Sequence, residues 1–262
     1  MKILITGSSG HLGEALVRTL KSLKHEVIGI DIAPSGFTHK VGSIVNKLFV
    51  KQCMQGVEAV IHTATLHKPH IITHSYSEFV ETNISGTLNL LEEAASVGVA
   101  AFIFTSTTST FGDVLSPPAG YPATWVTEEV VPVPKNIYGI TKTAAEDLCK
   151  MFHRNHKLPC LILRTSRFFP EEDDSKKTRL EYADGNSKAN EFLYRRVDTE
   201  DVVSAHLHAL EKASSIGFGK YIISATSPFT PDDLWELRNN ATAVVTRLFP
   251  DYVEEYKRPL FK

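Results

Sequence analysis

The amino-acid sequence predicts an α/β fold: a Rossmann-type, doubly wound parallel sheet with a reduced C-terminal lobe on the substrate side. Three observations predict it. Short apolar runs of strand length alternate with segments whose apolar residues recur at helical spacing, as βαβ units require. Glycine, aspartate and hydroxyl residues follow the ends of the expected strands. The length of 262 residues fits one large domain with a small lobe.

The expected strands are short apolar runs at residues 2–6, 26–30, 59–62, 101–105, 160–163 and 220–224. Helical periodicity predicts helices over residues 12–23, 83–97, 144–156 and 201–213. Crossovers between parallel strands are almost always right-handed, so these units build one sheet that is covered on both faces. Ligands of such sheets bind beyond the carboxyl ends of the strands.

Residues 1–168 are assigned to the sheet domain, and the helix at 201–213 and the strand at 220–224 return to it. Residues 169–190 and 225–262 form the expected small lobe on the substrate side. The proline-rich segment 113–135 predicts a long ordered loop with a functional role, and the charged segment 170–190 predicts a flap.

Composition excludes several classes of protein. The net charge of −2 argues against a generic nucleic-acid binder, and no apolar run approaches the roughly 20 residues that span a bilayer. The cysteines Cys53, Cys149 and Cys160 are odd in number and scattered, which argues against a disulfide framework or a thiolate zinc site. A reducing, cytoplasmic compartment is therefore expected, with neither nucleic acid nor membrane as a partner.

A glycine-rich turn, Gly7-Ser-Ser-Gly10-His-Leu-Gly13, joins the first expected strand to the first helix. Such a turn lets a pyrophosphate approach the backbone, where free N–H groups and the helix dipole hold the anion. The spacing and the strand–helix context predict a dinucleotide site, with a plain connecting turn as the alternative. Its expected binding residues are Gly7, Ser9, Gly10, His11, Leu12 and Gly13.

Asp31 ends the second expected strand, 18 residues after Gly13. A carboxylate at that place accepts hydrogen bonds from ribose hydroxyls and repels a 2′-phosphate, so it favours NAD over NADP. The alternative is a solvated aspartate at the end of a strand.

Tyr138 and Lys142 are four residues apart, which places them on one face of a helix. A nearby ammonium favours the phenolate and lowers a tyrosine pKa from its usual value of about 10. The tyrosine can then exchange a proton with a substrate hydroxyl during hydride transfer. A hydroxyl-rich run at residues 105–110 supplies candidates for a second group that orients the substrate oxygen. Alone, the pair would be a weak surface contact.

Seven segments in this order resemble the extended short-chain dehydrogenase/reductase superfamily, and within it the NAD-dependent sugar epimerase/dehydratase family. They are TGSSGHLG at 6–13, VIHTAT at 60–65, NISGTLNLLEEA at 83–94, FTSTTSTFG at 104–112, YGITK at 138–142, LRTSRFF at 163–169 and VDTEDVVSAHLHALE at 197–211. The resemblance implies a Rossmann fold, NAD as cofactor, and hydride transfer on a sugar or nucleotide sugar.

The resemblance also implies residue roles. Tyr138 is the expected acid/base, Lys142 lowers its pKa and holds the nicotinamide ribose, and Thr107 is the catalytic hydroxyl. The remaining expected cofactor residues are Ser43, Ile44, Thr63, Ala64, Thr65, Asn83, Thr105 and Phe168, with Phe169 beside the last. The expected substrate contacts are His67, Thr107, Thr108 and Arg167.

The sequence departs from the family pattern in four ways. Ser43 stands where the family often has an adenine-binding aspartate, and Arg167 replaces an asparagine that helps to bind a nucleotide sugar. Thr110-Phe111-Gly112 stands where the family has Val-Tyr-Gly, and the C-terminal lobe is short. A compact uronate-type dehydrogenase is therefore an alternative, in which Arg167, with Arg164 and Arg179 nearby in sequence, grips a carboxylate. Arg164 is also interpreted as a structural residue at a strand end. A non-enzymatic NAD(H) sensor is a further alternative, which the set of Thr107, Tyr138 and Lys142 opposes. An NADPH-dependent carbonyl reductase is another, which Asp31 opposes.

His67, His70 and His74 are spaced for one helical face, but Pro69 and the lack of a carboxylate favour a polar loop beside the pocket over a metal site, so no metal is expected. The acidic run at 171–174 is interpreted as part of the solvated flap.

The apolar faces of 83–97 and 144–156 suggest a four-helix homodimer seam, although each would also suit a monomer.

Overall fold

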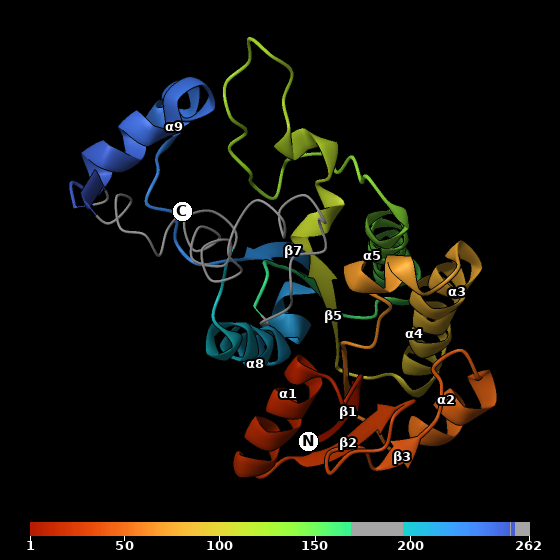
Figure 1. Cartoon of the computed structure of the whole chain (residues 1–262). Helices are drawn as coiled ribbons and strands as arrows, with labels where there is room; N and C mark the ends of the chain where they lie inside the picture. Colours follow the sequence, from red (N-terminus) through yellow and green to blue (C-terminus); the bar gives the residue numbers. More distant parts are fainter. Residues whose placement is uncertain (169–195, 252, 255–262) are drawn as a thin grey trace.

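The computed structural model describes residues 1–168, 196–251 and 253–254 of the chain. Within this part, a parallel seven-stranded sheet has the order β3-β2-β1-β4-β5-β6-β7 (Figure 1). The chain builds outward from β1 in both directions, as in a doubly wound sheet. The strands are β1 (Lys2–Thr6), β2 (Glu26–Asp31), β3 (Lys40–Val41), β4 (Ala59–His62), β5 (Ala101–Thr107), β6 (Cys160–Thr165) and β7 (Phe218–Ile223). The predicted fold class is confirmed.

Helices cover both faces of the sheet (Figure 1). On one face, α1 (His11–Ser22) and α8 (Thr199–Ile216) contact each other and the strands. On the other face lie α2 (Lys47–Cys53), α4 (Gly86–Val97) and α5 (Ile137–His156), with the short α3 (Tyr76–Val80) against α5. Because both faces are buried, the strands consist of nearly continuous apolar residues.

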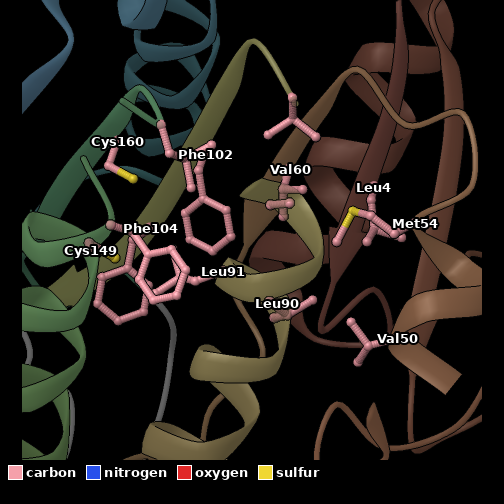
Figure 2. Packing of buried hydrophobic residues seen from close by; sticks show 14 of the residues in the cluster. Leu4, Val50, Met54, Val60, Leu90, Leu91, Phe102, Phe104, Cys149 and Cys160 are labelled. Carbon is pink, nitrogen blue, oxygen red and sulfur yellow. The ribbon is translucent and has the colours of Figure 1, made fainter. Parts of the chain in front are cut away.

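The core on the α4 and α5 side shows how the strands and helices interlock (Figure 2). Leu4, Val60, Phe102 and Phe104 point from the strands toward Leu90 and Leu91 of α4. All three cysteines are free thiols buried in this cluster, where they behave as small apolar side chains. The opposite side chains of the same strands pack on α1 and α8.

The boundaries of several elements differ from the prediction. The helix predicted over 144–156 begins at Ile137, because Asn136 caps it by accepting a hydrogen bond from the Gly139 amide at 3.0 Å. The strand predicted to end at Thr105 runs to Thr107. The short β3, α2 and α3 have too little periodicity to be predicted, and they are additions to the expected fold.

The loop at 113–135 is ordered, and it makes hydrogen bonds both to β7 at the edge of the sheet and to the C-terminal helix α9 (Leu234–Leu248). The amide of Ala123 donates to the carbonyl of Leu234, and Arg238 donates to the carbonyl of Pro117. Glu128 accepts a hydrogen bond from the Ile222 amide of β7. The predicted flap at 170–190, with the acidic run at 171–174, Phe169 and Arg179, lies outside the described residues. Among the described helices, none has the length and apolar character needed to cross a bilayer.

Candidate functional site

A cavity of about 1370 Å³ opens at the carboxyl edge of the sheet. Segments that follow β1, β2, β4, β5 and β6 line it, so residues far apart in sequence meet there. Of the predicted site residues, those that line it are Gly7, Ser9, Gly10, His11, Leu12, Gly13, Asp31, Ser43, Ile44, Thr63, Ala64, Thr65, His67, Thr105, Thr107, Thr108, Tyr138, Arg167 and Phe168. Lys142 is buried behind the cavity wall, and so is Asn83, which the resemblance places behind the cofactor site.

The glycine-rich turn is a close-packed cradle. Gly7 has φ +71°, a conformation that favours glycine. A Cβ on Gly13 would lie 2.0 Å from the Gly7 carbonyl oxygen, so helix α1 packs on the turn backbone itself. Gly10 is the N-cap of α1 and has no side chain to cap it, and it lines the cavity with His11 and Leu12. The first-turn N–H groups and the positive end of the helix dipole therefore suit a pyrophosphate.

Asp31 is held at the cavity wall by backbone hydrogen bonds. Its Oδ2 accepts from the Ser9 amide and its Oδ1 from the Ala33 amide, each at 3.0 Å. These bonds attach the end of β2 to the glycine turn. Each carboxylate oxygen retains further acceptor capacity, which suits vicinal ribose hydroxyls.

A hydrogen-bond chain supports the cavity wall after β4, and the sequence did not indicate it. The Thr6 Oγ1 accepts from the amides of Thr63 at 3.2 Å and Ala64 at 3.1 Å. Its proton is therefore donated to Nδ1 of His62 at 2.7 Å, and Nε2–H of His62 donates to Thr87 Oγ1 at 2.9 Å. Burial lowers the pKa of His62 well below its usual value, which keeps the ring neutral in this chain.

Asn83 lies in a π-helical turn, Glu81–Ser85, a feature frequent at functional sites. Its Oδ1 accepts from the Leu66 amide at 2.8 Å and from Thr65 Oγ1 at 3.0 Å. Its Nδ2 donates to the Leu66 carbonyl at 2.9 Å and to Thr141 Oγ1 at 3.0 Å. The amide uses its full hydrogen-bonding capacity to fasten the Thr65–Leu66 wall to α5.

Helix α5 presents Tyr138 to the cavity and buries Lys142 one turn later. Tyr138 is 9% exposed and Lys142 is 2% exposed. The Lys142 ammonium donates to the Thr105 carbonyl at 2.6 Å and lies 4.0 Å from the centre of the Phe104 ring. Burial lowers the pKa of Lys142 to about 7, against the opposing effect of Glu146. Thr107 lines the same cavity, and its Oγ1 accepts from the Ser109 amide at 3.1 Å.

His206 of α8 is a second residue that sequence reasoning missed. Its Nδ1–H donates to the Val202 carbonyl at 2.7 Å, so its Nε2 accepts from Thr105 Oγ1 at 2.7 Å. Burial lowers the pKa of His206 to about 4 and keeps it neutral. The two partners are 101 residues apart, and only the packing of α8 on β5 brings them together.

The histidines after β4 form a row of edge-to-face ring contacts along the cavity. Ring centroids are 4.4 Å apart for His67 and His70 and 5.1 Å for His70 and His74. The row surrounds a 3-10 turn, Lys68–Ile72, and burial lowers the pKa of His67 to about 4. No group of three metal-binding side chains is placed to hold an ion in the part of the chain that the structure describes.

Arg164, on β6, and Arg167, just after β6, have different roles. Arg164 is buried on β6 and donates to both carboxylate oxygens of Glu146, which confirms its interpretation as a structural residue. Arg167 lines the cavity, where its backbone bridges to Arg196.

The sequence matches the NAD dependent epimerase/dehydratase family over residues 3–223. It is 30% identical over 185 residues to an uncharacterized UDP-glucose epimerase of Bacillus subtilis, covering 63% of this chain and 55% of that protein. It is 26% identical to a uronate dehydrogenase of Pseudomonas syringae, covering 77% and 71%. The chain spans about half the length of the first curated relatives it matches, 55% and 39%.

Among solved structures, the fold is similar to a UDP-glucuronic acid 4-epimerase from Bacillus cereus, in complex with UDP-glucuronic acid and NAD. The TM-score is 0.68 with 25% identity, and the match covers 87% of this chain and 78% of the other. With the glycine-rich turn, Asp31 at the end of β2 and the parallel sheet in place, the family match over residues 3–223 has a structural counterpart. The chain belongs to the NAD dependent epimerase/dehydratase family, whose cofactor is NAD.

Proposed function

We propose that this chain catalyses NAD-dependent hydride transfer on a sugar or nucleotide sugar, with Tyr138 as the acid/base. One observation carries the proposal: Tyr138 and Thr107 line the same cavity as the glycine cradle and Asp31. Lys142 lies one helical turn behind Tyr138, where its ammonium favours the phenolate. Cofactor and proton-transfer groups therefore share one space.

Different residues of the cavity would hold different parts of the dinucleotide. The turn at residues 7–13 would hold the pyrophosphate, and Asp31 the adenosine ribose, which selects NAD over NADP. Ser43 and Ile44 would border the adenine, and Thr63, Ala64 and Thr65 the centre of the dinucleotide. Thr105 and Phe168, which line the same cavity, would border the nicotinamide. Lys142 and Asn83 support this arrangement from behind the wall.

At the reacting centre, Thr107 and Tyr138 would both hydrogen-bond to one substrate oxygen and fix its orientation. Tyr138 takes the proton of that hydroxyl or returns it. NAD, when bound, supplies the hydride acceptor or donor for the carbon that bears the oxygen. The hydroxyl of Thr107 already accepts from the Ser109 amide, which directs its own proton away from that amide.

The substrate side favours a polar, anionic ligand. His67, Thr108 and Arg167 line it and are the proposed substrate contacts. Solved relatives bind UDP-glucose or UDP-glucuronic acid, and a curated relative acts as a uronate dehydrogenase. Arg167 is the observation that favours the second candidate, a uronate-type dehydrogenase, because a guanidinium matches a carboxylate in two-pronged fashion.

The decisive assay incubates the chain with NAD and, in separate reactions, UDP-glucose, UDP-glucuronic acid and free glucuronate. Absorbance of accumulating NADH identifies a dehydrogenase, and product without NADH identifies an epimerase. Tyr138→Phe should lower turnover by about 10²- to 10⁴-fold, because it removes the proton-transfer group, while NAD still binds. Near-normal turnover of this variant refutes the role of Tyr138. NAD binding without turnover on a broad sugar and alcohol panel would favour the NAD(H) sensor.

We also propose a homodimer that pairs α4 and α5 of two copies. A shallow groove between these helices is lined by Ala95 and Phe152, and Val97 at the end of α4 is 46% exposed. Light scattering tests this proposal, and a monomeric mass at micromolar concentration contradicts it.

A further inference from the structure

A buried carboxylate lies one helical turn beyond Lys142 on α5, and the proposed mechanism does not use it. Glu146 is 0% exposed. Its Oε1 accepts from Ser106 Oγ at 2.6 Å and from Arg164 Nε at 3.0 Å. Its Oε2 accepts from Arg164 Nη2 at 2.6 Å and from Lys220 Nζ at 3.2 Å. One side chain thus connects α5 to β5, β6 and β7.

The position of Ser106 gives this network a link to the site. Ser106 lies on β5 between Thr105, whose carbonyl accepts the Lys142 ammonium, and Thr107, the candidate catalytic hydroxyl. Because side chains alternate along a strand, Ser106 faces the carboxylate while its neighbours face the opposite side. A second bond, from Thr165 Oγ1 to the Ser106 carbonyl, holds the same residue from β6.

Glu146 supplies a negative charge to a cluster of cations. The carboxylate faces three cations: Arg164 and Lys220 in ion pairs, and Lys142 one turn earlier on α5. The Nη1 atom of Arg164 finds no acceptor among the described residues, so its guanidinium is satisfied only by this carboxylate and by the Phe111 ring 5.1 Å away. The Lys142 ammonium has a carbonyl and an aromatic ring as its immediate partners, and neither carries a negative charge.

We propose that Glu146 is a positioning residue of the candidate site: its buried carboxylate keeps the Lys142 ammonium charged and fixes the end of β5 that carries Thr105 and Thr107. The inference rests on the proposed function, because a charged Lys142 matters only if Tyr138 exchanges protons. Loss of the carboxylate would leave Lys142 among uncompensated cations, in a site where burial already disfavours its charged form.

The titratable groups around Lys142 come from each element packed on it. Glu146 and Cys149 of α5 and His62 of β4 interact with Lys142 directly, and Tyr138 precedes it by one turn of α5. Arg164 of β6 and Lys220 of β7 act on Glu146, and Cys160 of β6 acts on Cys149. Burial lowers the pKa of His62, and burial raises the pKa of the Cys149 thiol, so both are neutral near pH 7. Glu146 is therefore the group whose negative charge acts on Lys142 in that range.

The test is a direct titration of Lys142 by NMR. The chain is labelled with ¹³C-lysine, the Lys142 Cε signal is assigned by its loss in Lys142→Met, and its midpoint is followed against pH without substrate. Glu146→Gln should move the midpoint to lower pH by about one unit or more, since neighbouring charges of this kind shift titrations by that amount. Glu146→Asp keeps the charge and should stay within about half of that shift.

Lys220→Gln is the matched variant, because it removes a cation from the same carboxylate at a partly exposed position and leaves the buried Glu146–Arg164 pair intact. It should move the midpoint to higher pH, and it tests the inference even if Glu146→Gln does not fold. A midpoint that responds to neither variant, or a Glu146→Gln that melts earlier with an unchanged midpoint, overturns the inference. The readout needs no turnover, so a chain that shifts as expected but is inactive on every sugar refutes the proposed function alone.

Discussion

Substitution of Gly13 by alanine tests the glycine cradle at its tightest point. A Cβ at this position would lie 2.0 Å from the Gly7 carbonyl oxygen, 2.7 Å from its carbonyl carbon and 2.9 Å from Ser8 Cα. All three are backbone atoms, so no side chain can rotate away, and α1 must shift from the turn. Overpacking of this kind costs about 1–3 kcal/mol. In a free helix the same change would stabilise by about 1 kcal/mol, so the sign of the effect is decisive.

The assay is thermal unfolding of the chain without ligand, followed by NAD titration. Each kcal/mol lowers the melting temperature by about 2–4 °C in a domain of this size, so Gly13→Ala should melt about 2–12 °C earlier. Gly10→Ala is the matched control, because its Cβ would meet only the Gly7 oxygen at 3.4 Å. That variant should lose less than about 1 kcal/mol. A Gly13→Ala variant that melts at or above the wild-type temperature refutes the cradle geometry.

Two other predictions follow from the hydrogen bonds around the site. Asp31→Ala should weaken NAD binding about 10- to 100-fold, because hydrogen bonds to a charged acceptor are lost, and should strengthen NADP binding relative to NAD, because the repulsion of the 2′-phosphate is removed; calorimetry with both dinucleotides measures the ratio, and an equal loss for both contradicts the ribose role. The pKa of His206 is about 4 in the folded chain and about 6.5 in the unfolded chain, because burial disfavours the charged ring. Its stabilising effect is therefore present above pH 6.5 and is lost as the pH falls toward 4. At pH 5 the free energy of unfolding is lower by about 2 kcal/mol for this reason, and His206→Gln should lack this loss. Urea unfolding of the wild type and of the variant at pH 8 and pH 5 measures it, and an equal loss in both proteins contradicts the prediction.

The strand pattern and the ligand-binding edge could be predicted from the sequence because they depend on local composition. Residues 2–6 and 59–62 are apolar runs without alternation, which is what burial on both faces requires, and they are strands with those bounds. Gly7 and Gly13 could be predicted because their constraint is local: a positive φ and a close helix–turn approach. Almost every predicted site residue that is described lines the cavity, since the carboxyl ends of parallel strands meet at one edge.

The supporting network could not be predicted because it depends on tertiary contacts. His62 and Thr87 belong to different elements, and their hydrogen bond gives no local sequence signal. Lys142 was expected to face the cofactor, but in this structure its ammonium donates to the Thr105 carbonyl behind the wall. The helix that carries it begins seven residues earlier than its apolar periodicity indicated, because a capping asparagine, and not periodicity, fixes its start.

The central claim is that the cradle and Asp31 hold a dinucleotide across the carboxyl edge of the sheet, beside Tyr138. Isothermal titration of the chain with NAD and with NADH tests it most directly. The account predicts saturable binding of both dinucleotides at one site per chain, together with a higher melting temperature at saturation. The absence of both heat and thermal stabilisation at millimolar dinucleotide would contradict it.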